Sequence, residues 1–191
     1  MFKFLLNLFS RISFDPGARE DPYDPRDFEW QEIGIAAPPF DWERGWHIHD
    51  IVRKRLNNPD FMLPVKDQNG SLSCGGQAWS TYGSVLEALH TGTFEERSAK
   101  FIYAQTAVPG GGSAGRTNCQ LVHDQGFGHE SLTPSYKDGS PPHEPFMIQR
   151  QDITDHARNE AAYAKVYAYA SVPFAIDLIA QAAQLSHGLV M

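Results

Sequence analysis

The chain has 191 residues, of which 41% are hydrophobic and 20% charged, and its formal net charge is −7. This length can bury one substantial core, and the composition is ordinary for a globular domain. The negative charge and the lack of a Lys/Arg run argue against nucleic acid as a partner, since phosphate binding needs a basic face. Only two cysteines are present, Cys74 and Cys119. Their scarcity favours a reducing compartment, and we expect a cytoplasmic protein.

The N-terminal region divides into an apolar segment and a linker. Residues 1–12 place four apolar side chains on one helical face: Leu5, Leu8, Phe9 and Ile12. The segment is too short to span a membrane, and both a secretory signal and a docking helix that contacts a membrane stay open. Residues 14–39 are rich in Asp, Glu and Pro, which predicts an extended linker with little regular structure. We therefore expect an N-terminal region over 1–39 and a folded domain over 40–191.

Two histidines follow the start of the expected domain. His47 and His49 would lie on one side of an extended chain, as metal ligands sometimes do. No third ligand stands nearby with a recognisable spacing, so we expect ordinary surface or packing histidines, with neither a metal site nor a cofactor. Residues 51–56 then predict a short helix with a solvated basic face.

The segment from Leu63 to Cys74 places a glutamine, Gln68, six residues before a cysteine. Asn69-Gly70-Ser71 is typical of a turn. After Cys74 the apolar residues recur at three- and four-residue steps, which predicts a helix with one buried stripe: Ala78, Tyr82, Val85, Leu86 and Leu89. A lone cysteine is more often a small buried apolar residue. At a helix N-terminus, however, the backbone N–H groups and the dipole favour the thiolate. The Cys74 N–H and the Gln68 amide could then donate to one point, as an oxyanion hole does.

This segment resembles the active-site region of papain-like cysteine peptidases, in which a Pro-Val-Lys-Asp-Gln strand end supplies the oxyanion-hole glutamine and the cysteine is the nucleophile. Three further segments follow in the family's order. Residues 96–103 resemble a segment in which a serine caps a second helix. Residues 110–115 resemble a glycine-rich loop that pairs with the substrate backbone, although such a run alone is typical of a flexible loop. Residues 117–136 resemble a helix, its glycine exit and a "Glu-x-x-Tyr-Pro-Tyr" turn.

The resemblance implies an α+β papain-like fold, represented mainly by its helical half, with Cys74 at the head of the central helix. It implies that Cys74 and Gln68 are catalytic and that Gly111, Gly112 and Ser113 line a groove for a peptide or protein substrate. Aligned in this way, Cys119 is a core position on a helix face. The function implied is that of a cysteine-type peptidase.

The sequence also departs from the family's "Cys-Gly-Ser-Cys-Trp" signature. Ser71 stands in place of the upstream cysteine, and Gly75 in place of the aromatic residue. Gln77 and Trp79, one turn further on, are expected to refill part of that space. Gly75 and Gly76 should weaken the first helical turn by roughly 1 kcal/mol each relative to alanine.

The family's base histidine and its asparagine follow the cysteine by about 130 to 150 residues, a distance that runs past Met191. His123 and His129 flank the Gly126 turn. Residues 176–191 resemble a helix and the first strand of the β half, which makes His187 a turn residue. We therefore expect a truncated peptidase that self-associates through an uncovered apolar face. A non-catalytic papain-fold binding module, or a fragment of a longer reading frame, stays open.

Overall fold

The structure is a computed structural model that describes residues 18–19, 21, 29, 38–136 and 143–187. The predicted helix over residues 1–12 and most of the predicted linker lie outside this part of the chain. Within the linker, Ala18–Arg19 forms a short strand, β1, where little regular structure was expected.

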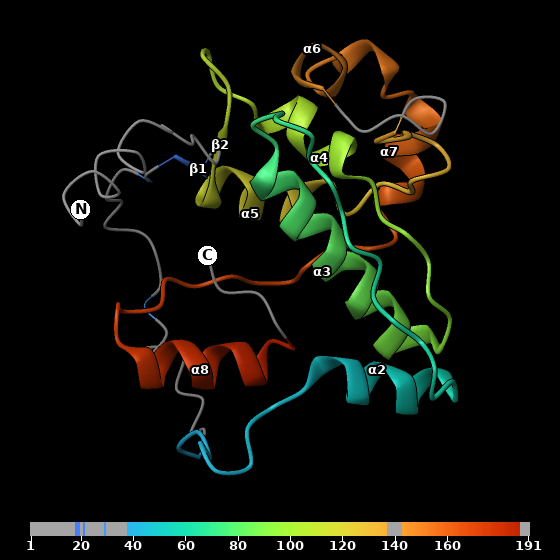
Figure 1. Ribbon diagram of the computed structural model, residues 1–191. Helices are drawn as coiled ribbons and strands as arrows, with labels where there is room; N and C mark the ends of the chain where they lie inside the picture. Colours follow the sequence, from blue (N-terminus) through green and yellow to red (C-terminus); the bar gives the residue numbers. More distant parts are fainter. Residues whose placement is uncertain (1–17, 20, 22–28, 30–37, 137–142, 188–191) are drawn as a thin grey trace, which may run out of the picture.

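The body of the molecule is a group of helices around the 18-residue helix α3 (Cys74–Thr91). Helices α4 (Ala99–Thr106) and α5 (Gly115–Asp124) contact the N-terminal part of α3, and α2 (Ile48–Leu56) packs on it from the other end (Figure 1). The remaining elements are β2 (Ser113–Ala114), α6 (Glu144–Met147), the 3-10 turn η2 (Arg150–Asp152), α7 (Asp155–Ala161) and α8 (Ile176–Leu185). Helix α8 lies to one side of this group.

Helix α3 packs on its neighbours through small residues. A Cβ on Gly76 would lie 2.8 Å from the Ala99 carbonyl oxygen, and one on Gly83 would lie 2.5 Å from the Phe127 ring. Of the predicted apolar stripe, Val85 is fully buried, whereas the other four residues are only half-buried. The helix was predicted correctly, but the predicted stripe is not its main buried face. That face consists largely of glycine and serine, because the neighbouring helices approach α3 closely.

The core lies between α3, α4, α5 and α7. Its largest buried side chains are Trp79, Phe101, Ile102, Leu121, Phe127 and Ile153. Trp79 is 6% exposed and lies near the Tyr82 and Phe127 rings, so the prediction that it refills space beside Cys74 is wrong. Cys119 packs against this core, as predicted.

Several local predictions are confirmed. Ser98 caps α4, since its hydroxyl accepts a hydrogen bond from the Phe101 N–H at 2.9 Å. The chain leaves α5 at Gly126, whose φ of +92° lets its backbone pass close to the Ala161 carbonyl. The histidines are an exception to this agreement. His49 lies inside α2, and His47 immediately precedes it, so the predicted extended chain is wrong at this point.

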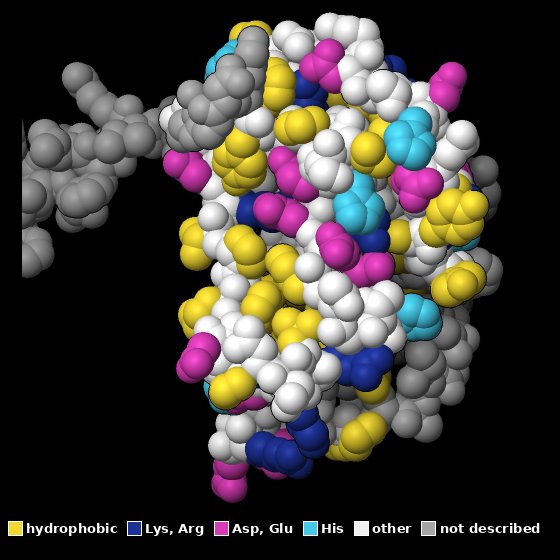
Figure 2. Space-filling model, turned by 90° about the vertical axis from the view of Figure 1, so that its right-hand side faces the viewer, with side chains coloured by type: hydrophobic (Ala, Val, Ile, Leu, Met, Phe, Trp, Pro, Cys, Tyr) yellow, Lys and Arg dark blue, Asp and Glu magenta, His cyan; other side chains and the backbone are white. Residues whose placement is uncertain are grey.

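The described residues contain little β structure. Strands β1 and β2 pair in parallel, with Ala18 opposite Ser113 and Arg19 opposite Ala114. Two isolated bridges join Glu29 to Ser171 and Arg97 to His129. Among the described residues, no helix is both long and apolar enough to span a membrane. Figure 2 shows acidic and basic side chains interspersed over one face, with Lys and Arg gathered mainly at its lower end.

Candidate active site

The turn before Cys74 has the geometry that its sequence predicts. Asn69 and Gly70 have φ values of +42° and +71°, and the Ser71 N–H donates to the Gln68 carbonyl oxygen at 2.8 Å. Positive φ at both central positions defines a type I′ turn, for which Asn-Gly is the preferred pair. Helix α3 then begins at Cys74, as predicted. Gln68 and Cys74 are both half-buried.

The extended chain that carries Gln68 is attached to α3 by its neighbour Lys66. The Lys66 ammonium donates to the Ser80 hydroxyl at 3.0 Å and to the Arg97 carbonyl oxygen at 3.1 Å. On its other side, the Asp67 backbone hydrogen-bonds the phenol of Tyr136. Burial raises the Tyr136 pKa above its usual value, and this hydrogen bond opposes the rise. Contacts from distant elements therefore hold the chain at both Lys66 and Asp67, just before Gln68.

The first turn of α3 is closely surrounded. Ser73 does not cap the helix with its side chain; its hydroxyl lies 2.7 Å from that of Ser71 and accepts from the Gln77 amide at 3.4 Å. A Cβ on Gly75 would lie 2.6 Å from Asn118 Nδ2. The space beside the Gly75 Cα is thus filled by α5, which explains why glycine follows the cysteine.

The glycine loop is held against the turn before Cys74. Gly110, Gly111 and Gly112 all have φ between +83° and +88°, a region that favours glycine. A Cβ on Gly111 would clash with the Leu72 side chain. Ser113 is 2% exposed, and its hydroxyl accepts a hydrogen bond from the Asn118 amide at 3.0 Å. The Ser113 side chain therefore faces the protein, and only its backbone is disposed to pair with another strand.

That backbone already pairs with the N-terminal part of the chain. Strand β1 lies along β2, and the Asp21 carboxylate accepts from the Arg116 N–H at 3.0 Å, at the start of α5. The carboxylate satisfies one of the orphan donors of a helix N-terminus. A peptide can pair with the same edge of β2 only after β1 has left it.

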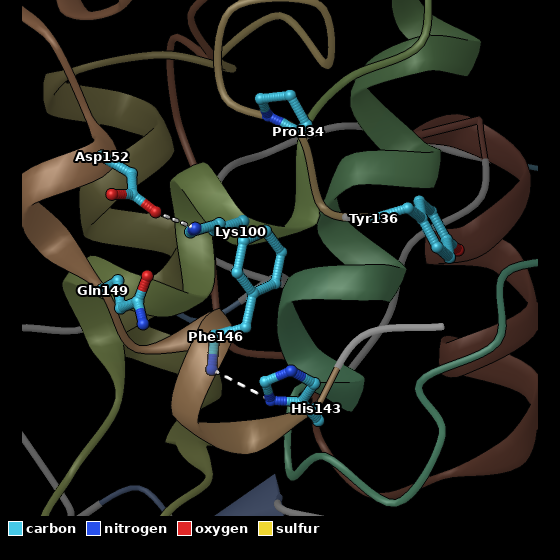
Figure 3. A pocket seen from close by; sticks show the side chains of 7 residues that line it. All are labelled: Lys100, Pro134, Tyr136, His143, Phe146, Gln149 and Asp152. Atoms are coloured by element: carbon cyan, nitrogen blue, oxygen red, sulfur yellow. Dashed lines mark hydrogen bonds and ion pairs between the residues drawn. The ribbon is translucent and has the colours of Figure 1, made fainter. Parts of the chain in front are cut away.

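Two hollows flank this region. One, of about 360 Å³, lies along α3 and is lined by Gln77, Thr81, Tyr82, Lys66 and His187 among others. The Gln77 Oε1 is buried there and has no hydrogen-bond partner among the described residues. The second, of about 510 Å³, is shown in Figure 3. In that view the Lys100 ammonium pairs with Asp152 and lies 3.4 Å from the centre of the Phe146 ring.

The histidines that sequence reasoning considered lie in different places. His123 is at the end of α5, and its Nδ1 lies 2.8 Å from the Asp124 carboxylate. His129 bridges to Arg97 through the backbone. His187 follows α8 in a turn, as predicted, with a φ of +61°, and lines the hollow along α3 together with Gln77. Among the described residues, no group of three metal-ligating side chains occurs.

Sequence reasoning missed Glu144 and the contact that it makes with Tyr103. Glu144 accepts a hydrogen bond from the Leu72 N–H at 2.7 Å and another from the Tyr103 hydroxyl at 2.5 Å. Glu144 lies 72 positions beyond Leu72 in the chain, and no spacing in the sequence signals their contact.

Comparison with known proteins gives one structural match. Xylellain, a cysteine protease from Xylella fastidiosa, superposes with a TM-score of 0.59 at 22% sequence identity, over 88% of this chain and 62% of that one. The chain has a papain-like fold. No family model and no curated protein sequence matches it. The matched part is less than two thirds of xylellain, and at this sequence identity the likeness extends to the fold alone.

Proposed function

We propose that this chain is a cysteine-type peptidase domain in which Cys74 is the nucleophile. The observation that supports this most is that α3 begins at Cys74 directly after a rigid turn that starts at Gln68. A helix N-terminus favours a thiolate. The Cys74 N–H and the Gln68 amide would bind the oxyanion, and the backbone of Gly111, Gly112 and Ser113 would contact a peptide substrate.

The proposed chemistry is acyl transfer. The Cys74 sulfur forms a bond to the carbonyl carbon, negative charge develops on the carbonyl oxygen, and the leaving group departs when the carbonyl re-forms. A poor leaving group such as an amine needs a proton from a general acid, and that contribution is worth about 10² to 10⁴ in rate. No described histidine has the sequence position of the family's base, so we expect the chain alone to hydrolyse peptide bonds barely or not at all.

An activated ester separates these requirements, because p-nitrophenolate leaves without a proton. We expect an N-acyl dipeptide p-nitrophenyl ester to acylate Cys74, which mass spectrometry of proteolytic fragments detects as an added acyl group. Gln68→Ala should slow acylation by roughly 10² to 10³, the effect of removing one oxyanion donor. Cys119→Ser is the matched control and should leave the rate unchanged. Acylation that is equally fast at Cys119, or insensitive to Gln68, would contradict the proposal.

A second candidate function is a non-catalytic binding module for extended peptides. The observation that favours it is the pairing of β1 with β2, since this edge accepts a strand in a parallel arrangement. A module of this kind would bind a peptide with equal affinity in the wild-type chain and in Cys74→Ser, and its Cys74 would show no acylation preference. The ester experiment therefore separates the two functions.

We also propose that the chain self-associates through its exposed apolar surface. Val65 is 97% exposed, Met62 is 61% exposed, and both precede the turn that carries Gln68. Exposed large apolar side chains favour association or binding of an apolar dye where they gather on one surface. Sedimentation and dye fluorescence test this, and a dye-silent monomer with full helical circular dichroism would contradict it.

A further inference from the structure

Two walls of the proposed site are joined by one chain of hydrogen bonds. The Gly112 N–H donates to the Tyr103 hydroxyl at 2.8 Å, and that hydroxyl donates to Glu144 Oε1 at 2.5 Å. The second carboxylate oxygen, Oε2, accepts from the Leu72 N–H at 2.7 Å. Leu72 stands two residues before Cys74, and Gly112 stands one residue before β2.

The Glu144 carboxylate at the centre of this chain acts only as an acceptor. Both groups that contact Glu144 are donors, so each of its oxygens acts as an acceptor. Only an ionised carboxylate presents two acceptor oxygens without a donor. Hydrogen bonds to a charged acceptor are also stronger than those between neutral groups.

The two side chains in this chain of hydrogen bonds, Tyr103 and Glu144, are held by buried neighbours. Tyr103 is fully buried in α4 and packs with Ala99 and Met147. Met147 is in the same short helix as Glu144, and the Phe146 ring lies beneath the Lys100 ammonium (Figure 3). Helix α6 is therefore fixed against α4, and it presents Glu144 to the turn before Cys74.

We infer that Glu144 and Tyr103 are positioning residues, which hold the turn before Cys74 and the glycine loop at a fixed separation. This inference rests on the proposed function and deepens it. The nucleophile and the backbone that pairs with the substrate then keep one spacing, as acyl transfer to a bound peptide requires. A displacement of about 1 Å at such a site lowers the rate by as much as 10².

Two conservative variants of the full chain test the inference. Glu144→Gln keeps the side-chain volume but sets an NH2 donor against one of two donors, and Tyr103→Phe keeps the ring but removes the hydroxyl. The matched controls are Glu95→Gln, at an exposed position, and Tyr163→Phe, where the side chain is 88% exposed. Thermal melting checks that all four variants are folded.

The first readout is amide hydrogen exchange, which does not depend on activity. We expect exchange at the Leu72 N–H to be about tenfold faster in Glu144→Gln, and exchange at the Gly112 N–H about tenfold faster in Tyr103→Phe, the effect of losing one such hydrogen bond. Neither control should change these rates. Unchanged exchange in both variants would overturn the inference.

The second readout compares two esters, the N-acyl dipeptide p-nitrophenyl ester and p-nitrophenyl acetate. Only the dipeptide ester uses the glycine loop, so the ratio of their acylation rates at Cys74 measures alignment between the two walls. We expect Glu144→Gln and Tyr103→Phe to lower this ratio about tenfold, because the acetate does not contact the glycine loop and loses less of its rate than the dipeptide ester does. If the two esters acylate Cys74 of the wild type at similar rates, the proposed function itself is contradicted. If the wild type strongly prefers the dipeptide ester and both variants keep that preference, only the positioning role is contradicted.

Discussion

Helices α4 and α8 are similar in length and both rich in apolar residues, yet the structure uses them differently. In α4, seven of eight residues are buried, and the helix carries Tyr103 and the cap Ser98. In α8, Ala182 is the only buried residue, and contacts such as that of the Gln181 amide with the Pro38 carbonyl attach it to the rest of the chain. The comparison teaches that apolar content alone does not identify the part of the chain that positions the site. A helix positions the site when it packs closely against several neighbouring elements, as α4 does.

The largest expected effect contrasts the same substitution in the two helices. Ile102 in α4 is fully buried, whereas Ile176 at the start of α8 is 72% exposed. Ile102→Ala should lower the free energy of unfolding by about 2–5 kcal/mol, because it removes buried methyl groups and leaves a cavity. Ile176→Ala should change it by less than about 0.5 kcal/mol. Urea unfolding monitored by circular dichroism measures both, and similar losses for the two variants would refute the comparison.

A smaller effect is expected where α3 approaches α4. Replacing a helical glycine with alanine usually stabilises a helix by roughly 1 kcal/mol. At Gly76 the new methyl group would lie 2.8 Å from the Ala99 carbonyl and 2.9 Å from the Tyr103 Cβ. We therefore expect Gly76→Ala to destabilise the protein by about 1–3 kcal/mol. A stabilised variant in the same unfolding assay would show that the two helices are not in close contact.

The smallest effect concerns the pH dependence of stability around Glu130. Its carboxylate accepts from the Ser135 N–H at 2.5 Å and from the Ser135 hydroxyl at 2.7 Å, in the loop that packs beside α4. Burial raises the Glu130 pKa above its ordinary value of 4.5, and the Ser135 hydrogen bonds oppose the rise. The folded state therefore binds this proton more tightly than the unfolded state does. The stabilisation is fully present below pH 4.5 and is lost as pH rises through the raised pKa.

Glu130→Gln removes this titration. The stability of the wild type relative to Glu130→Gln should thus fall as the pH rises from 4.5, whereas the difference between the wild type and Glu95→Gln should stay flat. Thermal melts across this pH range provide the measurement. A relative stability that increases with pH would mean that the hydrogen bonds from Ser135 outweigh burial.

Local features of the site could be predicted from the sequence, and long-range features could not. Asn69-Gly70, Ser98 and Gly126 act on backbone groups within a few residues of themselves, so the sequence could predict the turn, the helix cap and the helix exit. The contact of Glu144 with Leu72 depends on how α6 packs against α4, which no local pattern encodes. The buried face of α3 was misjudged because hydrophobic periodicity gives little weight to Gly76 and Gly83, although close packing requires them. The burial of Trp79 was missed for the same reason.

The central claim is that the fold prepares Cys74, and not Cys119, for nucleophilic attack. Both thiols are half-buried in the same molecule and neither forms a disulfide, so each serves as a control for the other. Cys74 heads α3, whereas Cys119 lies within α5 and packs against the core. The most direct measurement is the rate at which iodoacetamide alkylates each cysteine of the folded protein near neutral pH. We predict that Cys74 is alkylated faster, since only it lies at a helix N-terminus, where the thiolate is favoured. Equal rates, or faster alkylation of Cys119, would contradict the claim.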